Sequence, residues 1–173
     1  AIQLAKKLGR LKVIASASRT DSTAWARGLG ADAVVDHTQP LPEQMSALGI
    51  PEANYILCCS NTDTLFPVLP RVAAPQGQVC SIVRTTKPVD LAILQEKSIT
   101  FAWEGMFTRS TFQTPDMRAQ HELLDDAAGL LESGVLVTTL RENLGRICAA
   151  NLRLAHQRIE HGHAIGKIVL EGF

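Results

Sequence analysis

The sequence predicts an α/β fold built on a doubly wound parallel sheet. Short apolar runs without polar alternation recur through about the first hundred residues, which is typical of strands buried on both faces. Segments with helical spacing, capping residues and glycine stops separate these runs. Parallel strands need crossover connections of this length, so the alternation indicates βαβ units with helices on both faces of the sheet.

The elements follow one another in chain order. The opening helix ends near Gly9, and Thr20, Asp21 or Ser22 can cap the second helix. The segment 75–77, Pro-Gln-Gly, is expected to turn the chain into the fourth strand. We expect strands at 13–15, 33–35, 55–59, 79–83 and 99–103, joined by helices at about 1–8, 20–29, 40–48 and 63–72.

The pattern changes after Trp103. Residues 104–117 form a long, aromatic and aperiodic stretch, which favours a functional or interface loop. Helices are expected at about 117–132 and 149–160, followed by a strand at 167–170. We therefore divide the sequence into a nucleotide-binding domain, residues 1–104, and a C-terminal part of helices and one strand, residues 105–173.

Composition excludes some classes of partner. Hydrophobic residues make up 46% of the chain, and 17 Lys and Arg residues balance 17 Asp and Glu residues. No strong overall field would draw the protein to nucleic acid or to an anionic membrane, and no apolar run approaches the roughly 18 residues of a membrane helix. The four cysteines show neither CxxC pairs nor a disulfide framework, so reduced thiols in a cytoplasmic protein are expected.

The most informative polar residues follow the strand at 13–15. Ligands bind open α/β sheets at the carboxyl ends of the strands, and an NAD-binding unit places an acid after its second strand to bind the ribose. This sequence instead has Ser18, Arg19 and Ser22, whose hydroxyls and guanidinium can bind phosphate oxygens. A bound dinucleotide would therefore be NADP. The alternative is that Ser18 and Arg19 form a solvated loop before a capped helix.

Other chemistries have weaker support. His161 and His163 flank Gly162 at a predicted helix end, where polar residues are favourable without binding metal, so we expect no metal site. No GxSxG motif occurs, and Trp25 and Trp103 are expected to pack rather than to stack on a ligand.

Several motifs carry a resemblance to a known family. The runs "LGADAVVDH", "APQGQV", "WEGMFTRSTFQTPDM" and "GKIVLEGF" are similar to the cofactor-binding half of the medium-chain dehydrogenases/reductases. Within that superfamily the chain resembles the zinc-type alcohol dehydrogenase-like group, close to the quinone oxidoreductases. The likeness covers essentially all 173 residues.

The resemblance also implies what would precede residue 1. In such proteins a strand and a glycine-rich turn come before the first helix, and a GroES-like catalytic domain comes before them. We therefore expect a Rossmann domain truncated before its first helix, a coenzyme-binding fragment that is inactive alone. Its C-terminal strand would return towards the catalytic domain. The strands near Val13 and Ile56 should then lack their shared neighbour, leaving a gap, a swapped strand or a rearranged sheet.

The implied cofactor contacts come from several strand ends. Ser18, Arg19 and Ser22 match the 2′-phosphate region, and His37 matches the position beside the adenosine. Ser60 and Asn61 match the loop at the ribose, and Ile82 and Val83 match the floor beside the nicotinamide. Phe107 matches a position near the cofactor cleft, and Lys167 lies on the returning strand. In chain order they are Ser18, Arg19, Ser22, His37, Ser60, Asn61, Ile82, Val83, Phe107 and Lys167.

The activity that the resemblance implies is NADPH-dependent hydride transfer to a small quinone, enone or other carbonyl compound, in a homodimeric oxidoreductase. No catalytic acid or base is assigned within this chain, and no zinc ligand. Two alternatives remain open, a nucleotide-sensing module without chemistry and a dimerisation unit.

Overall fold

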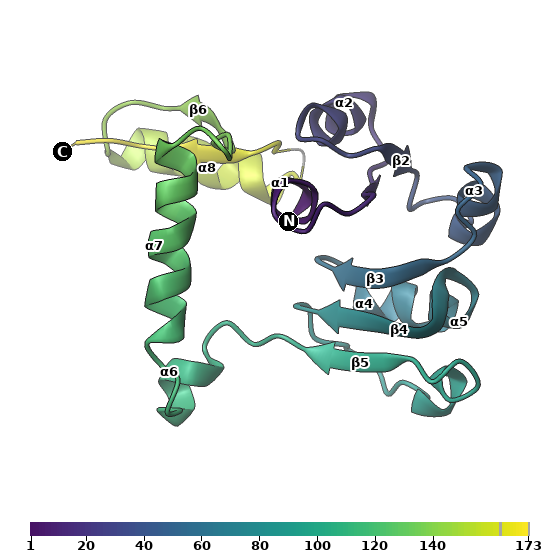
Figure 1. Ribbon diagram of the computed structural model, residues 1–173. Coiled ribbons are helices and arrows are strands. Elements are labelled where there is room, and N and C mark those ends of the chain that lie inside the picture. The colour runs from purple at the N-terminus through teal and green to yellow at the C-terminus, as the bar shows by residue number, and fades with distance from the viewer. Residues whose placement is uncertain (163, 173) are drawn as a thin grey trace. The chain divides into compact units, whose positions relative to one another are not determined.

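The chain forms two compact units in the computed structural model, which describes residues 1–162 and 164–172 (Figure 1). Unit 1 comprises Ala1–Ala15, Arg19–Asp32 and Asp125–Phe173. Unit 2 comprises Ser16–Ser18 and Ala33–Leu124.

Unit 2 contains a three-stranded sheet of β3 (Ala53–Cys58), β4 (Ala73–Ser81) and β5 (Thr100–Trp103), in that order. Strand β4 pairs in parallel with β3 on one side and with β5 on the other, as the sequence predicts. Figure 1 shows the three arrows pointing the same way, so their carboxyl ends share one edge of the sheet. That edge is where polar residues follow each strand.

One face of this sheet carries the core of unit 2. In the register, Ile56 lies opposite Val79, which lies opposite Phe101. Phe66 packs edge-on against Phe101 with ring centroids 5.3 Å apart. The buried cluster consists of Phe66, Leu69, Ala73, Val79, Leu94 and Ile99.

The segment behind this face differs from its prediction. Instead of one helix at 63–72, the structure has α4 (Thr62–Leu65), the 3-10 helix η1 (Phe66–Val68) and α5 (Leu69–Val72). Pro67 and Pro70 lie in the first turns of η1 and α5. A proline lacks the N–H that would continue the preceding helix, so each one starts a new short piece.

The opposite face of the sheet carries large exposed apolar side chains. Tyr55 and Leu57 alternate with the buried positions of β3 and keep 62% and 50% of their surface. Strand β3 is at the edge of its sheet, and β1 (Ile14–Ser16) belongs to another. The strands near Val13 and Ile56 therefore do not share a sheet, and the expectation of a gap, a swapped strand or a rearranged sheet between them stays a prediction.

Strand β4 begins earlier than expected. The segment 75–77 lies within the strand, so the predicted turn is wrong. The pairing with β3 shifts between Ala53 and Tyr55, and Gln76 has a positive φ of 61°. A Cβ on Gly77 would lie 2.7 Å from the carbonyl oxygen of Ala74. The glycine therefore permits a bulge where a turn was expected.

The remaining elements of unit 2 are short. Strand β2 (Ala33–Val35) matches its prediction, and α3 (Leu41–Ala47) lies within the predicted helix. The 3-10 helix η2 (Leu91–Leu94) was not predicted. Within the stretch expected to be a loop, the structure has the helix α6 (Thr108–Phe112).

Unit 1 is mainly helical. Its helices are α1 (Ile2–Lys7), α2 (Thr20–Gly28), α7 (Ala119–Glu132) from Asp125 onward, and α8 (Ala149–Glu160), which matches its prediction. Strands β6 (Leu140–Asn143), which was not predicted, and β7 (Lys167–Val169) pair in parallel. None of the helices in the described part of the chain is long and apolar enough to cross a membrane.

Helix α1 is joined to the segment after α7 by two hydrogen bonds of one side chain. The Gln3 amide donates to the Val137 carbonyl and accepts from the Val137 N–H, both at 2.8 Å. The N-cap of α2 is Arg19, so the prediction of Thr20, Asp21 or Ser22 as the cap is wrong. The Ser22 hydroxyl donates to the Arg19 carbonyl at 3.0 Å from within the first turn.

Candidate functional site

The carboxyl edge of the sheet in unit 2 gathers three chain segments. Residues after β3, β4 and β5 lie there because the three strands are parallel. The Ile82 N–H donates to the Cys58 carbonyl at 3.1 Å, and the Glu104 N–H donates to the Ser81 carbonyl at 2.9 Å. The hydrogen-bond ladder of the sheet thus continues one residue beyond the ends of β4 and β5. The segments that follow these two strands separate only after Ile82 and Glu104.

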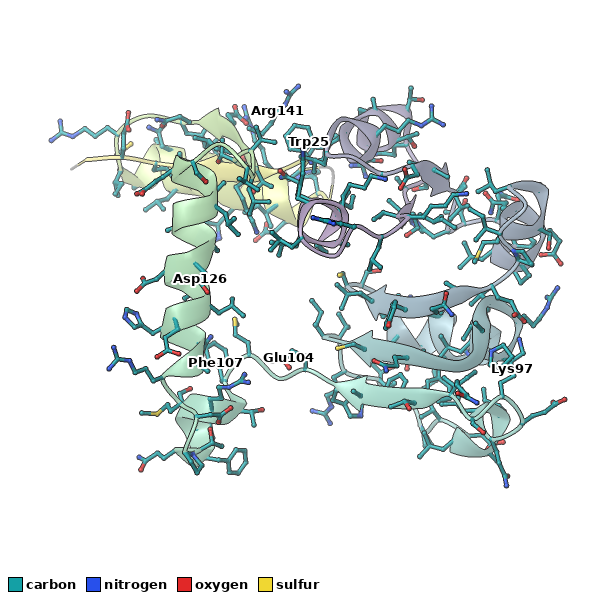
Figure 2. All side chains as sticks on the ribbon, viewed as in Figure 1. Trp25, Lys97, Glu104, Phe107, Asp126 and Arg141 are labelled. Atoms are coloured by element: carbon teal, nitrogen blue, oxygen red, sulfur yellow. The ribbon has the colours of Figure 1, made fainter. Side chains whose placement is uncertain are left out.

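A pocket of about 250 Å³ opens between the ends of β4 and β5. Trp103 packs edge-on against Phe101, with centroids 4.9 Å apart, and keeps 52% of its surface exposed. Figure 2 shows Glu104 on the segment that leaves β5, with Phe107 further along it. Apolar walls and one charge of each sign therefore surround the pocket, which is lined by Ile82, Arg84, Trp103, Glu104 and Gly105.

Two buried hydroxyls lie beneath the segment that lines this pocket. Thr62 and Ser81 are 2% and 0% exposed, and their oxygens are 2.6 Å apart. Thr62 donates to the Val83 carbonyl at 2.5 Å, and the Val83 N–H donates to the Ser81 hydroxyl at 3.2 Å. Sequence reasoning missed both residues, although a serine within the apolar run of β4 was a usable signal.

The residues after β3 are already engaged in local structure. Asn61 caps α4, its Oδ1 accepting from the Thr64 N–H at 3.2 Å, while Ser60 is exposed. Asp63 accepts from both the N–H and the hydroxyl of Thr86, the latter at 2.6 Å. These hydrogen bonds, chiefly the one from the Thr86 hydroxyl, lower the pKa of Asp63.

In unit 1, Arg19 and Ser22 lie together at the N-terminus of α2. The Arg19 side chain donates to the Gly162 carbonyl at 3.4 Å, and its Nε lies 3.4 Å from the Asp21 carboxylate. The Arg19 guanidinium at a helix N-terminus fits an anionic phosphate, whereas the Ser22 hydroxyl already donates to the Arg19 carbonyl. Asp21 opposes that fit, and sequence reasoning gave it no weight.

The other predicted contacts are more dispersed. Ser18 and His37 are exposed residues of unit 2. Phe107, which is 66% exposed, is the N-cap of α6 and lies two residues beyond Gly105 of the pocket. Lys167 is exposed at the start of β7 in unit 1. In unit 2 the predicted residues Ser60, Asn61, Ile82 and Val83 therefore follow the same edge of the sheet, and in unit 1 Arg19 and Ser22 lie together.

A second hollow, of about 540 Å³, lies within unit 1 between α2 and the segments around β6 and β7. The Arg141 guanidinium lies over the Trp25 ring, 5.6 Å from its centroid (Figure 2). Trp25 therefore packs against a side chain of its own unit, as the sequence predicts.

The described residues do not provide a zinc site. Residues 1–162 and 164–172 contain no group of three His, Cys, Asp or Glu side chains arranged to hold a metal ion. His161 is exposed, and His163 lies outside the described residues. The donor set of this part of the chain does not fit zinc.

Parallel strands with a pocket and polar residues at their carboxyl ends define the class, an α/β protein of the Rossmann kind. Residues 29–170 match the family described as zinc-binding dehydrogenase. The chain belongs to this family, which confirms the resemblance drawn from its motifs.

Individual relatives agree with this assignment. The chain is 39% identical over 170 residues to a zinc-type alcohol dehydrogenase-like protein of Staphylococcus aureus strain MSSA476, covering 98% of this chain and 50% of that protein. It is 40% identical to a structure from Rhizobium etli CFN 42 assigned as a zinc-dependent alcohol dehydrogenase, with a TM-score of 0.92 over 100% of this chain and 50% of the other.

A mycobacterial protein solved in complex with NADPH shares the fold, with a TM-score of 0.75 and 22% identity over 99% of this chain and 52% of that one. The chain therefore spans about half the length of the relatives that it matches.

Proposed function

We propose that this chain is the coenzyme-binding half of an NADPH-dependent oxidoreductase that transfers hydride to a quinone, an enone or another carbonyl compound. The observation that carries the proposal is the pocket at the carboxyl ends of β4 and β5. Its volume of about 250 Å³ suits one ring-sized group rather than a whole dinucleotide. When bound, a reduced nicotinamide supplies the hydride.

The residues of the pocket have distinct roles in this proposal. Ile82 and Trp103 form apolar walls that exclude water from a planar ring. Arg84 and Glu104 place a donor-rich cation and an acceptor on the pocket's lining, where they can orient polar substituents. Ser60 and Asn61, after β3, would face the ribose.

The preference for NADP rests on the N-terminus of α2. Arg19 can form a forked pair with phosphate oxygens, and Ser22 adds a hydroxyl. The Asp21 carboxylate, 3.4 Å from Arg19, partly neutralises the guanidinium. A 2′-phosphate would have to compete with Asp21, so we expect a moderate preference for NADP.

Assembly and location complete the proposal. We expect a homodimer, because β5 is an edge strand of its sheet and exposes Trp103. The four cysteines are free, which favours the cytoplasm.

The cofactor assignment can be tested by titrating the full gene product with NADPH and NADH. We expect tighter binding of NADPH, and Arg19→Ala should weaken it about tenfold while leaving NADH nearly unchanged, because only NADPH carries the 2′-phosphate. Arg27→Ala, at the other end of α2, is the matched control and should change neither affinity. Equal affinity for both nucleotides, or a preference that survives Arg19→Ala, would show the phosphate assignment to be wrong.

A further inference from the structure

The two buried hydroxyls beneath the pocket form a closed hydrogen-bonded ring with one peptide unit. The Val83 N–H donates to Ser81 Oγ at 3.2 Å, and the Val83 carbonyl accepts from Thr62 Oγ1 at 2.5 Å. The two hydroxyl oxygens are 2.6 Å apart. Ser81 Oγ also lies 3.2 Å from the Val83 carbonyl oxygen. Since each hydroxyl has one proton, one arrangement that satisfies every group runs from the Val83 N–H to Ser81, to Thr62 and back to the Val83 carbonyl.

The position of this ring is not explained by core packing alone. Among the described residues, Thr62 and Ser81 are the buried polar side chains. The core nearby is apolar, including Phe66, Leu69 and Val79. Buried polar networks contribute less to stability than to selecting one arrangement of the backbone when every member is satisfied. The ring satisfies both backbone polar groups of Val83, in the segment that follows β4.

That segment is the one that lines the pocket. The N–H of Ile82 is held by the Cys58 carbonyl, and both polar groups of Val83 are held by the ring. The Ile82 side chain between these anchors is 52% exposed and forms a wall of the pocket. Fixing the backbone on both sides of Ile82 fixes the direction in which that wall faces.

We propose that Thr62 and Ser81 are positioning residues for the nicotinamide, acting through the backbone of Ile82 and Val83. Neither hydroxyl needs to touch the cofactor. The inference rests on the proposed function and deepens it, because it names the residues that set the shape of the ring-sized pocket.

The test combines a binding measurement with a backbone measurement on the full gene product. Thr62→Val keeps the side-chain shape and removes the hydroxyl, and Ser81→Ala removes the acceptor of the Val83 N–H. Both should raise the Kd of NADPH, read from nucleotide fluorescence, about tenfold. Amide exchange at Val83, measured without nucleotide, should become faster in Ser81→Ala.

Two further variants separate positioning from general stability. Thr62→Ser retains the hydroxyl and should keep the Kd within about threefold of the unsubstituted protein. Val79→Ala lies on the same strand and the same buried face but outside the ring, so it should lower Tm and leave the Kd unchanged.

The outcomes distinguish the inference from the proposed function. An unsubstituted protein that binds neither NADPH nor NADH overturns both. Binding that survives Thr62→Val and Ser81→Ala, or that Val79→Ala weakens equally, overturns the inference alone. If Thr62→Val does not fold, the test depends on Ser81→Ala alone. An unchanged Kd for NADPH together with unchanged amide exchange at Val83 in that variant would then overturn the inference.

Discussion

Asp63 links the start of α4 to the segment that follows β4. Its carboxylate accepts two hydrogen bonds from Thr86, through the backbone N–H and the hydroxyl. Because these bonds favour the charged form, the pKa of Asp63 lies below its ordinary value. The stabilisation is present above the unfolded-state pKa of about 3.9 and is lost as pH falls through the lower pKa of the folded state.

Asp63→Asn should therefore lower Tm at pH 7, since the amide offers one acceptor and turns a donor towards Thr86. The difference from the unsubstituted protein should shrink as pH falls below about 4, since the unfolded chain protonates first and the folded carboxylate only at its lower pKa. Thermal unfolding followed by circular dichroism at both pH values measures this. Asp126→Asn, on the exposed surface of α7, serves as the control, and a difference that stays constant with pH would contradict the role of the charge.

Single residues show how far the candidate site could be predicted. Ile82 was singled out through the family resemblance, and in the structure it lines a pocket directly after β4. Thr62 and Ser81 were missed because their role depends on a pairing between segments 19 residues apart. Hydropathy along the chain does not reveal which buried hydroxyl meets which carbonyl.

At the scale of elements, residues at neighbouring positions of β3 and β4 differ strongly in exposure. Val79 on β4 is 2% exposed and packs in the core, whereas Leu57 on neighbouring β3 is 50% exposed on the opposite face. A shift of one residue in the pairing would exchange these environments. The stability effects of substitutions at the two positions therefore report the register directly.

Val79→Ala should reduce the free energy of unfolding by about 2 kcal/mol, through lost apolar burial and the cavity left behind. Leu57→Thr should change it by no more than about 0.5 kcal/mol, because the side chain is half exposed and threonine is well accepted in strands. Chemical denaturation of both variants provides the comparison. An equal loss of unfolding free energy in Val79→Ala and Leu57→Thr would rule out this register.

Elements with strong local signals were predicted well. Helix α8 matches its predicted bounds, and the parallel order follows from the crossover segments. Strand β6, with the sequence LREN, was missed because its polar residues hide the strand pattern and its pairing with β7 is non-local. Helix 63–72 failed for a local reason, the two prolines that divide it.

At the scale of the whole molecule, the balanced charge of the chain provides no strong overall field for anions, so the proposed phosphate contact depends on local groups at the N-terminus of α2. The family assignment covers residues 29–170, and the curated relatives are about twice as long as this chain.

The central claim is NADPH-dependent hydride transfer, and the most direct measurement is the oxidation of NADPH and NADH by the full gene product with a quinone and an enone as acceptors. Loss of nicotinamide absorbance gives the rate. We predict acceptor-dependent oxidation, with kcat/KM for NADPH about tenfold above that for NADH. Binding without turnover would favour the nucleotide-sensing alternative, and a preference for NADH would contradict the role given to Arg19.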